Sequence, residues 1–314
     1  MAGKLVCVVG PTACGKTRLG VLLAQKYHGE VVSADSMQIY RGMTVGTAAP
    51  TPEEMEGVTH HMVGVADPSE SWSAARYAAE ATPVVDDIFA RGALPVLVGG
   101  TGLWMDALVR GHGFAGGHAG GAVRAELQRE LESGGLEPLL EELRRVDPVS
   151  AQRLHPADEK RILRALEVYR ETGETISAHN AETQALPPRY EAVYLGLQFS
   201  DREEMRRLID QRVDEMVEHG LLDEVRALVQ SGIPRDATAL QAIGYKEFLD
   251  VLLGTETLED AVAEVKLRSR QYAKRQLTWL RRLPNVHWIY WNGSRDFARA
   301  MQVSTEILSA EGLG

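Results

Sequence analysis

A phosphate-binding pattern lies near the start of the chain, where residues 10–17 read GPTACGKT. Gly10 and Gly15 permit a tight loop whose backbone N–H groups face an anion, together with the N-terminus of the following helix. Lys16 adds a positive charge, and the Thr17 hydroxyl is suited to Mg²⁺. An apolar stretch precedes the pattern and an amphipathic stretch follows it. The pattern therefore predicts a bound phosphate group without identifying the molecule that carries it.

A second candidate is Asp35, which follows the apolar stretch EVVSA at residues 30–34. Its carboxylate could bind a metal ion, accept a proton from a nucleophile, or cap the turn that follows. A nucleotide hydrolase usually carries an aspartate for magnesium after an apolar strand. Here, however, the apolar stretch at residues 95–98 is followed by GGTG. Asp35 is thus the only acid at a strand end near the predicted phosphate site.

The third candidate is Arg212, in a stretch of helical spacing that runs from Asp201 to Ser231. At about 100° per residue, Arg212 falls between Leu208 and Met216 on the apolar side of the helix. A charged group on an inward face requires a partner. That partner is either a carboxylate at the edge of the core or a bound anion, and the spacing leaves both open.

Short apolar stretches that predict strands alternate with helical patterns, which indicates a mostly parallel α/β sheet flanked by helices. The strand patterns lie at residues 5–9, 30–34, 95–99, 193–197 and 286–291. The phosphate pattern follows the first, Asp35 and Ser36 follow the second, and GGTG (99–102) ends the third. Because ligands bind at the carboxyl ends of strands in open α/β sheets, we expect these polar stretches to converge on one cleft.

Residues 111–188 differ in character from the rest of the chain. A glycine-rich stretch, GHGFAGGHAGGA, is followed by helical patterns, and strand patterns return only at Tyr190. We therefore predict a catalytic α/β core formed by residues 1–110 and 189–314. Residues 111–188 are predicted to form a helical insertion, attached by flexible joints, that could move as a lid.

The bulk composition is that of a globular protein, with 44% hydrophobic and 25% charged residues. No stretch approaches the roughly 18 apolar residues needed to span a bilayer, and no signal-peptide pattern is present, which favours the cytoplasm and no membrane partner. Cys7 and Cys14 make neither a disulfide framework nor a metal site. The net charge of −10 argues mildly against nucleic acid, but residues 266–282 hold seven basic residues and no acid. This basic stretch is either a nucleic-acid face or a solvated helix face.

Two histidines and four aromatic residues are weaker candidates. His60 and His61 would point to opposite faces of a strand and lack partners at metal-ligand spacing, so we expect no metal there. The aromatic residues could stack on nucleic-acid bases, but packing at the core or its edge is the more common role. They are Tyr272, Trp279, Trp288 and Trp291.

Seven blocks occur in order over nearly the whole chain. They are GPTACGKT (10–17), DSMQIYRGMTVGTAAP (35–50), HHMVGVADP (60–68), LVGGTGLW (97–104), HPADEKRILRALEVY (155–169), AIGYKE (242–247) and RQYAKRQLTWLRR (270–282). Together these blocks resemble the tRNA dimethylallyltransferases, also called tRNA isopentenyltransferases, in their bacterial form. The resemblance implies a P-loop NTPase-like core and transfer of a dimethylallyl group from dimethylallyl diphosphate to the exocyclic N⁶ amine of the adenosine 3′-adjacent to the anticodon of tRNA. The phosphate loop would then hold the diphosphate that is released.

The resemblance also implies roles for the candidate residues. Arg212 would reach the diphosphate, and Asp35 would act as general base, because a carboxylate bonded to the adenine amine both orients it and accepts its proton. Thr17 would complete the catalytic set by binding Mg²⁺, the one cofactor implied. The diphosphate cradle would comprise Gly10, Thr12, Ala13, Cys14, Gly15, Lys16 and Thr17.

For tRNA, the resemblance implies a channel that the reacting adenine enters from the side opposite the donor. Residues beside the base would be Asp35, Ser36, Met37, Gln38 and Thr101. Contacts to the phosphate backbone would come from Lys160, Arg161 and Arg164 of the insertion and from Lys274 and Arg275 of the basic stretch. Each of these cations is otherwise a solvated surface residue. The chain would act on tRNA and dimethylallyl diphosphate as a monomer, without an obligate protein partner.

Three positions depart from the family pattern. Ala49 stands where the phrase GTAKP has lysine, Trp104 replaces a tyrosine, and FAGGHAGG (114–121) replaces a more proline-rich, acidic joint. Three alternative functions stay open. An adenylate isopentenyltransferase would use the same donor on a free nucleotide, and a small-molecule kinase would hold ATP in the phosphate loop. A non-catalytic RNA-binding protein would need no acid at Asp35.

Overall fold

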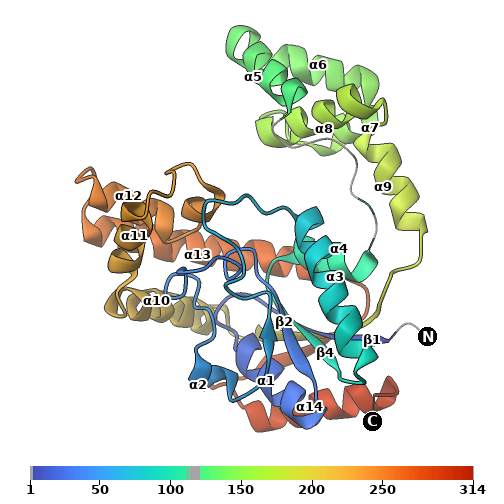
Figure 1. Ribbon diagram of the computed structural model, residues 1–314, viewed down its shortest axis with the longest axis vertical. Coiled ribbons are helices and arrows are strands. Elements are labelled where there is room, and N and C mark those ends of the chain that lie inside the picture. The colour runs from blue at the N-terminus through green and yellow to red at the C-terminus, as the bar shows by residue number, and fades with distance from the viewer. Residues whose placement is uncertain (1–2, 112, 114–120, 314) are drawn as a thin grey trace. The chain divides into compact units, whose positions relative to one another are not determined.

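The computed structural model describes residues 3–111, 113 and 121–313. The chain divides into two compact units, one formed by Met1–Gly111 with Arg189–Gly314 and the other by His112–Pro188. Apart from Gly121, the joint FAGGHAGG lies outside the described residues. Figure 1 labels the elements of both units.

The first unit is built on a six-stranded sheet whose paired strands are all parallel, in the order β3-β2-β4-β1-β5-β6. The strands are β1 (Lys4–Val9), β2 (Glu30–Ala34), β3 (His60–His61), β4 (Pro95–Gly99), β5 (Glu191–Phe199) and β6 (Val286–Trp291). The predicted parallel α/β sheet is therefore confirmed. The edge strand β3 was not among the apolar stretches predicted as strands, because two histidines give no apolar pattern.

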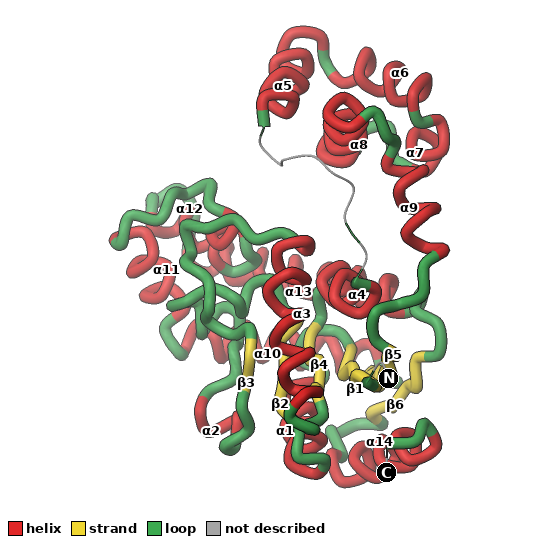
Figure 2. Tube along the Cα trace, turned by 45° about the vertical axis from the view of Figure 1, so that its right-hand side comes forward, coloured by secondary structure: helices red, strands yellow, loops and turns green. Residues whose placement is uncertain are grey.

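Alternate residues of the strands face two different layers of helices, because the side-chain period of a strand is two. From β1, Leu5 and Cys7 share a core with α3 and α4, whereas Val6 and Val8 share a core with α1 and α14. These helices are α1 (Lys16–Lys26), α3 (Ala74–Ala90), α4 (Gly102–Arg110) and α14 (Phe297–Ala310). In Figures 1 and 2, α1 and α14 lie side by side, as their contacts require.

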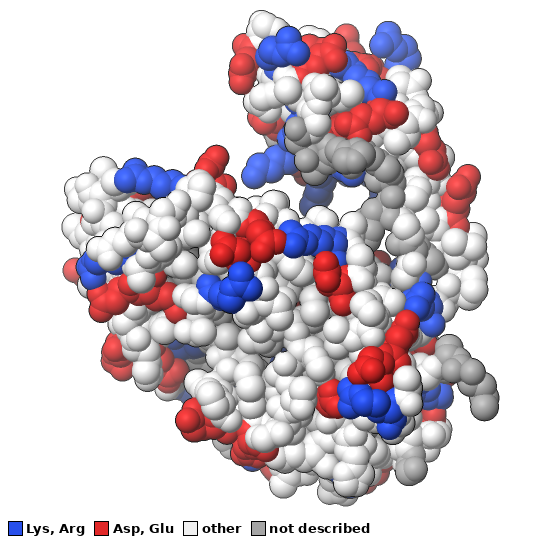
Figure 3. Space-filling model, in the orientation of Figure 1, with Lys and Arg blue, Asp and Glu red and all other residues white. Residues whose placement is uncertain are grey.

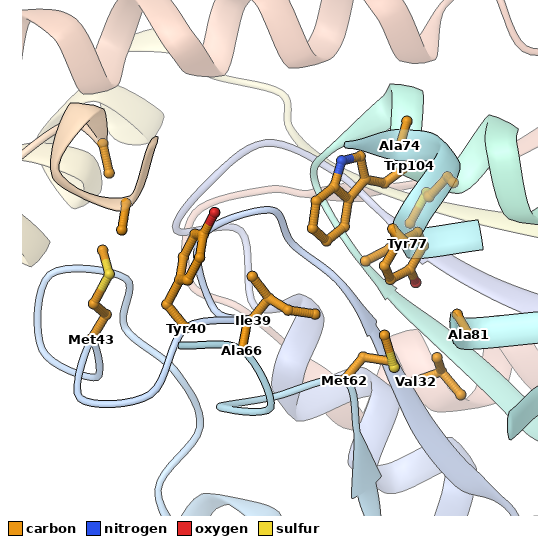
Figure 4. Close-up of a cluster of buried hydrophobic side chains, with 14 of the residues drawn as sticks. Val32, Ile39, Tyr40, Met43, Met62, Ala66, Ala74, Tyr77, Ala81 and Trp104 are labelled. Carbon is orange, nitrogen blue, oxygen red and sulfur yellow. The ribbon is translucent and has the colours of Figure 1, made fainter. Parts of the chain in front are cut away.

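Aromatic residues fill the core beneath α3 and α4. The Trp104 indole stacks on the Tyr77 ring with centroids 4.4 Å apart, and the Tyr77 hydroxyl donates to the Ser33 carbonyl (2.8 Å). Figure 4 shows both rings among buried neighbours that include Met62 and Val32. Trp104, a departure from the family pattern, is therefore a packing residue.

The register of the strands places three loops side by side. Val9 at the end of β1 and Ala34 at the end of β2 are both paired with Gly99 at the end of β4. The three strands therefore end at the same level of the sheet. The phosphate loop, Asp35 and the GGTG stretch converge at this edge, as predicted.

Helices that follow β5 complete the first unit. The bounds are α10 (Arg202–Glu218), α11 (Leu221–Gln230), a 3-10 turn η1 (Thr238–Gln241), α12 (Tyr245–Leu252) and α13 (Leu258–Leu280); a short α2 (Pro52–Met55) follows β2. The helical pattern predicted from Asp201 to Ser231 is thus divided into α10 and α11. Two ion pairs join α10 to α13, one from Asp210 to Arg270 (2.6 Å) and one from Asp214 to Lys266 (2.6 Å). These pairs fix the two helices against each other.

The second unit is helical, with a core of its own. Its helices are α5 (Ala122–Gly134), α6 (Leu136–Val146), α7 (Pro148–Arg153), α8 (Glu159–Thr172) and α9 (Ile176–Ala185). Leu127, Leu140 and Ile162 bring α5, α6 and α8 into one apolar cluster. Of these helices, α7 and α9 were not predicted, because α7 has six residues and α9 buries no side chain. Neither therefore carries an apolar periodicity.

Candidate active site

A cavity of about 720 Å³ opens at the carboxyl ends of the strands, with all of its lining residues in the first unit. The predicted site residues that line it are Thr12, Ala13, Gly15, Lys16, Thr17, Asp35, Gln38 and Arg212. Those of the first unit that do not line it are Gly10, Cys14, Ser36, Met37, Thr101, Lys274 and Arg275. The phosphate loop, the candidate base and the helix arginine therefore share one cavity, although they are spread over 200 residues of sequence.

The phosphate loop joins β1 to α1 in a conformation that its glycine spacing anticipates. Gly15 directly precedes α1 with a φ of 89°, in the left-handed region that residues with a Cβ rarely adopt. Among the described residues, no side chain caps the start of α1. The N–H groups of its first turn are therefore left for a ligand, and the helix dipole favours an anion there.

Two side chains from distant parts of the chain hold the phosphate loop in place. The indole Nε1 of Trp291, at the end of β6, donates to the carbonyl of Cys14 (2.9 Å). The amide Oε1 of Gln276, on α13, accepts from the backbone N–H of Thr12 (2.9 Å). Trp291 and Gln276 are both buried, so the loop is fixed by contacts that exclude water.

Two cations of the cavity lie against the phosphate loop. Lys16 Nζ donates to the carbonyl of Pro11 (2.8 Å), and Arg212 Nη1 donates to the hydroxyl of Thr12 (3.2 Å). Burial lowers the pKa of the Lys16 ammonium, and the charge of Arg212 lowers that pKa further. Burial likewise lowers the pKa of the Arg212 guanidinium. In the described part of the chain neither cation is ion-paired to a carboxylate, so an anionic ligand would stabilise both charges.

The inward position predicted for Arg212 is confirmed, because Leu208 and Met216 line the cavity with it from the same face of α10. The sequence left open whether its partner is a carboxylate or an anion. Asp35 is near enough to offset part of the burial that lowers the pKa of Arg212, but the only direct hydrogen bond from the guanidinium among the described residues goes to Thr12. The geometry thus leaves a place for an anion.

The Asp35 side chain both caps a turn and lines the cavity. Its Oδ1 accepts from the backbone N–H groups of Met37 (2.9 Å) and Gln38 (3.4 Å). The capping role that the sequence left open is therefore realised, and the carboxylate still faces the cavity that contains Lys16 and Arg212. A carboxylate held in this way has a fixed orientation towards a bound acceptor.

Ser36 and Thr101 lie behind the cavity wall and connect two loops. The Thr101 hydroxyl accepts from the backbone N–H of Ser36 (3.1 Å) and donates to the Ser36 hydroxyl (3.3 Å). Gln38 does line the cavity, and its Nε2 donates to the carbonyls of Thr47 (3.3 Å) and Ala48 (3.1 Å). These contacts fix the segment that begins with Asp35.

The loop at residues 44–49 forms another wall, and sequence reasoning missed the residue that shapes it. The Glu224 carboxylate, on α11, accepts from the backbone N–H groups of Thr44 (2.7 Å), Val45 (2.8 Å) and Gly46 (3.0 Å). The Tyr245 hydroxyl, from the AIGYKE block, donates to the same carboxylate (2.5 Å). Helices α11 and α12 therefore position this loop.

Ala49 is buried in this wall and lines the cavity. Since the family phrase has a lysine at this position, the chain presents a methyl group where the family pattern would place a charge. Position 49 therefore adds no cation to the cavity. The basic residues that line it are Lys16, Arg18, Arg212, His219 and Arg295. Arg18 is already ion-paired with Glu56.

The donor set for Mg²⁺ is small. Thr17 and Asp35 line the same cavity and offer a hydroxyl and a carboxylate oxygen. The described residues contain no cluster of three or more His, Cys, Asp or Glu side chains suited to a metal. Mg²⁺ commonly takes one or two protein oxygens together with substrate phosphates and water, so these two residues fit an ion that arrives with a diphosphate.

The predicted tRNA contacts fall in both units. In α8, Lys160 and Arg161 are exposed, Arg161 is paired loosely with Asp158 (3.4 Å), and the part-buried Arg164 is paired with Glu167 (2.9 Å). In Figure 3, basic and acidic side chains are intermixed over the visible surface of each unit. No single basic face is visible there.

The basic stretch 266–282 is partly neutralised within the protein. Lys266 and Arg270 form the ion pairs that join α13 to α10, and Arg268 pairs with Glu247 (3.1 Å). Arg275 and Lys274 are exposed, and the Arg275 guanidinium lies 5.6 Å from the centroid of the Tyr272 ring. Only the later residues of the stretch therefore remain candidates for RNA contact.

Several weaker candidates have structural roles. His61 Nε2 lies 2.6 Å from Glu30, and His60 Nδ1 lies 2.9 Å from the Val58 carbonyl. Cys7 and Cys14 are free and buried, and burial raises the pKa of both thiols. None of these four side chains lines the cavity.

Among the lining residues that sequence reasoning missed are Tyr272, Gln276 and Arg295. Tyr272 was expected to pack at the core or its edge, and its ring instead forms part of the cavity wall. Arg295 Nη1 donates to the Ala13 carbonyl (3.4 Å), and nothing in the sequence around it marks a site. A signal for Gln276 did exist, because an amide that falls among the buried positions of α13 requires partners.

No helix in the described ranges is long and apolar enough to cross a membrane.

Two family models match the chain. The model described as IPP transferase matches residues 38–283, and the model described as isopentenyl transferase matches residues 3–65. Curated proteins named tRNA dimethylallyltransferase are similar over most of their length. The protein from Halalkalibacterium halodurans is 46% identical, with 92% of this chain and 91% of the relative covered, and that from Geobacillus thermodenitrificans is 44% identical, with 95% and 94% covered.

Solved structures give the same result. The structure of a full-length tRNA isopentenylpyrophosphate transferase from Bacillus halodurans superimposes with a TM-score of 0.73 at 43% identity, covering 99% of this chain and 96% of that one. A eukaryotic dimethylallyltransferase described as acting on tRNA superimposes with a TM-score of 0.84 at 30% identity, covering 98% of this chain and 80% of the other. The likeness extends over the whole fold.

Proposed function

The chain belongs to the IPP transferase family, and from this premise we propose that it transfers a dimethylallyl group from dimethylallyl diphosphate to tRNA. The acceptor is the exocyclic N⁶ amine of the adenosine 3′-adjacent to the anticodon, and diphosphate is released. The observation that carries the proposal is that Lys16, Thr17, Arg212 and Asp35 line one cavity. An anion site and a carboxylate base within one cavity are what this transfer requires.

The phosphate loop holds the leaving group in this proposal. The uncapped start of α1 and the cations Lys16 and Arg212 attract the diphosphate, whose negative charge grows as the allylic C–O bond breaks. Because burial lowers the pKa of both cations, each gains stability when the anion binds. Fixed donors stabilise the departing charge without the reorganisation that water would need.

Asp35 acts on the acceptor. The lone pair of the adenine amine is delocalised into the ring, so the nitrogen is a poor nucleophile until a base accepts its proton. As the new N–C bond forms at the allylic carbon, the C–O bond to the diphosphate breaks and its electron pair leaves with the diphosphate. The amine proton passes to the Asp35 carboxylate, whose Oδ1 is held by the N–H groups of Met37 and Gln38.

We propose Mg²⁺ as the cofactor, with Thr17 as its ligand and Asp35 close by in the same cavity. The ion would supply further positive charge to the diphosphate oxygens. Removal of divalent ions with a chelator should therefore lower the transfer rate, and added Mg²⁺ should restore it.

The tRNA contacts in this proposal come from both units. Thr101 and Ser36 support the wall beside the base, and exposed Lys160 and Arg161 contact the phosphate backbone. Arg164, Lys274 and Arg275 are proposed as further contacts of the same kind. We further propose that the protein acts as a monomer, without an obligate partner subunit.

The direct test is incubation of the protein with labelled dimethylallyl diphosphate, Mg²⁺ and total tRNA, followed by nucleoside analysis. The expected product is N⁶-dimethylallyl-adenosine. A parallel reaction with free AMP should give no product. Absence of the modified nucleoside from tRNA would overturn the proposal, and a preference for AMP would identify an adenylate isopentenyltransferase.

A further inference from the structure

We propose that Gln276 is a positioning residue that couples the phosphate loop to the loops beside the acceptor, and this inference rests on the proposed function. Gln276 lies on α13, far in sequence from the residues it joins. The residue is 6% exposed, and it lines the cavity.

The Gln276 amide joins two loops through its two ends. Its Oε1 accepts from the backbone N–H of Thr12 (2.9 Å), and its Nε2 donates to the carbonyl of Gly100 (3.1 Å). A side-chain amide offers an acceptor and a donor at this spacing, whereas an ionised carboxylate only accepts and an aliphatic chain does neither. The loop after β1 and the loop after β4 are therefore held by one group.

The fit around this amide is tight. A Cβ built on Gly100 would lie 2.1 Å from Gln276 Nε2, so a larger residue at this position would displace the amide. A turn further along the same face of α13, the Trp279 ring lies against Gly102, where a Cβ would come within 2.1 Å of it. Two residues one helical turn apart on α13, Gln276 and Trp279, therefore contact the GGTG stretch closely.

Thr101 extends the connection to the acceptor side. It directly follows Gly100, whose carbonyl Gln276 binds, and Tyr272, one turn before Gln276, lines the same cavity. Thr101 in turn accepts from the backbone N–H of Ser36, the residue after Asp35. The connection therefore runs from Thr12 through Gln276 and the adjacent residues Gly100 and Thr101 to Ser36, in the segment that carries the proposed general base.

Thr12 is held from two helices at once. Gln276 of α13 binds its backbone N–H, and Arg212 of α10 binds its hydroxyl. The ion pairs Arg270–Asp210 and Lys266–Asp214 lock these helices together. Gln276 consequently fixes where the Thr12–Arg212 pair lies relative to Asp35.

This position matters because transfer requires the allylic carbon and the amine to approach to about 3–3.5 Å in line. A displacement of about 1 Å costs on the order of a hundredfold in rate. Loss of the Gln276 bonds should therefore lower kcat, whereas the KM values for the two substrates should change by less, because each loop keeps its own ligand contacts.

The test compares Gln276→Leu, Gln276→Glu and a matched control, Gln271→Leu, on the exposed face of the same helix. Steady-state kcat and both KM values are measured by varying one substrate, tRNA or dimethylallyl diphosphate, while the other is saturating. The melting temperature checks folding. We expect Gln276→Leu to lower kcat about a hundredfold with KM values within a few-fold. Gln271→Leu should match the wild type.

The pH dependence of kcat for Gln276→Glu distinguishes a positioning role from a merely structural one. A protonated carboxyl can both donate and accept a hydrogen bond, as the amide does here, and burial raises the pKa of a carboxyl. The ratio of its kcat to that of the wild type should therefore rise as the pH falls from about 8 to 6.

A Gln276→Leu enzyme with kcat within twofold of the wild type would overturn the inference. So would a loss of kcat that merely follows a loss of folded protein, or a Gln276→Glu ratio that is independent of pH. Failure of the wild type itself to modify tRNA would instead overturn the proposed function, and the inference with it.

Discussion

The first unit and the second unit are each stabilised internally by a different kind of contact. In the first unit, the cavity is surrounded by buried polar contacts that connect distant residues, such as Trp291 with Cys14 and Gln276 with Thr12. In the second unit, one apolar cluster is surrounded by ion pairs at the surface, and two of the predicted RNA contacts, Lys160 and Arg161, are exposed side chains. In the proposed function, the chemistry therefore lies in the first unit, and the second unit contributes exposed cations to RNA binding.

The polar contacts of the second unit tie its own helices together. The Asp147 carboxylate accepts from the hydroxyls of Ser150 and Ser177 (both 2.6 Å), which joins α7 to α9. Arg170 of α8 pairs with Glu130 of α5 (2.8 Å) and with Glu142 of α6. None of these contacts involves the cavity, so changes in the two units should have separable effects.

The largest effect is expected from Asp35→Asn. Asparagine can still accept the N–H groups of Met37 and Gln38, so the turn should persist while the base is lost. We expect kcat to fall by about 10³, within the 10²–10⁴ range of general-base catalysis. Single-turnover transfer measures the rate, and filter binding should find the tRNA affinity within a few-fold. A variant that keeps a tenth of the rate would contradict the role of Asp35.

A smaller loss is expected from Arg212→Lys. The ammonium cannot reproduce the planar guanidinium that contacts Thr12, so stabilisation of the leaving diphosphate weakens. We expect kcat to fall about a hundredfold. Calorimetry with inorganic diphosphate should find weaker binding, with unchanged tRNA affinity. The control is Arg207→Lys on the exposed side of α10, where Arg207 pairs with Glu204. Equal losses in the two variants would contradict the assignment.

Substitutions in the second unit should lower the affinity for tRNA and leave kcat unchanged, the reverse of the cavity variants. Replacing Lys160 and Arg161 together by alanine removes exposed charge without touching the cavity. We expect tRNA affinity to fall about tenfold and the slope of log K against log salt to decrease by roughly two, while kcat at saturating tRNA stays the same. Arg206→Ala, in the first unit, is the control. A fall in kcat of the double variant at saturating tRNA would break the separation between the units.

The smallest effect concerns the stability of the second unit. Hydrogen bonds from Arg170 lower the pKa of Glu130 below its ordinary value of 4.5. The stability that Glu130 contributes is therefore present above about pH 4.5 and is lost as the pH falls through its lowered pKa. At pH 7, Glu130→Gln should reduce the free energy of unfolding by about 0.5 kcal/mol, because the pair is partly exposed. Urea titrations at pH 7 and 3 should find that the difference shrinks at the lower pH.

Much of the first unit follows from local sequence. Residues 30–34, 95–99 and 286–291 were predicted as strands, and the structure has the same bounds for β2, β4 and β6. Apolar β-branched stretches and the alternation of strands with helices are local patterns, so they can be recognised in the sequence without knowledge of the tertiary fold. The position of Arg212 was likewise accessible, because helical periodicity alone places it beside Leu208 and Met216.

The residues whose side chains hold the loops of the cavity in place could not be predicted from local sequence patterns. Gln276 and Thr12 are separated by 264 residues, and Glu224 is 180 residues from Thr44. Contacts of this kind depend on which strands and helices become neighbours, and no local pattern contains that information. The block RQYAKRQLTWLRR drew attention to its basic residues, whereas the structure places its tyrosine and its second glutamine at the cavity.

The bond between Trp291 and Cys14 has a consequence for synthesis. A ribosome that has reached residue 188 has made the phosphate-loop sequence and the whole insertion, but not Arg212, Gln276 or Trp291. The strands that complete the sheet, β5 and β6, also come later. The insertion has its own core and can fold early, whereas contacts between distant residues form slowly. An unfinished chain therefore has the phosphate loop without the distant side chains that hold the loop and complete the cavity around it.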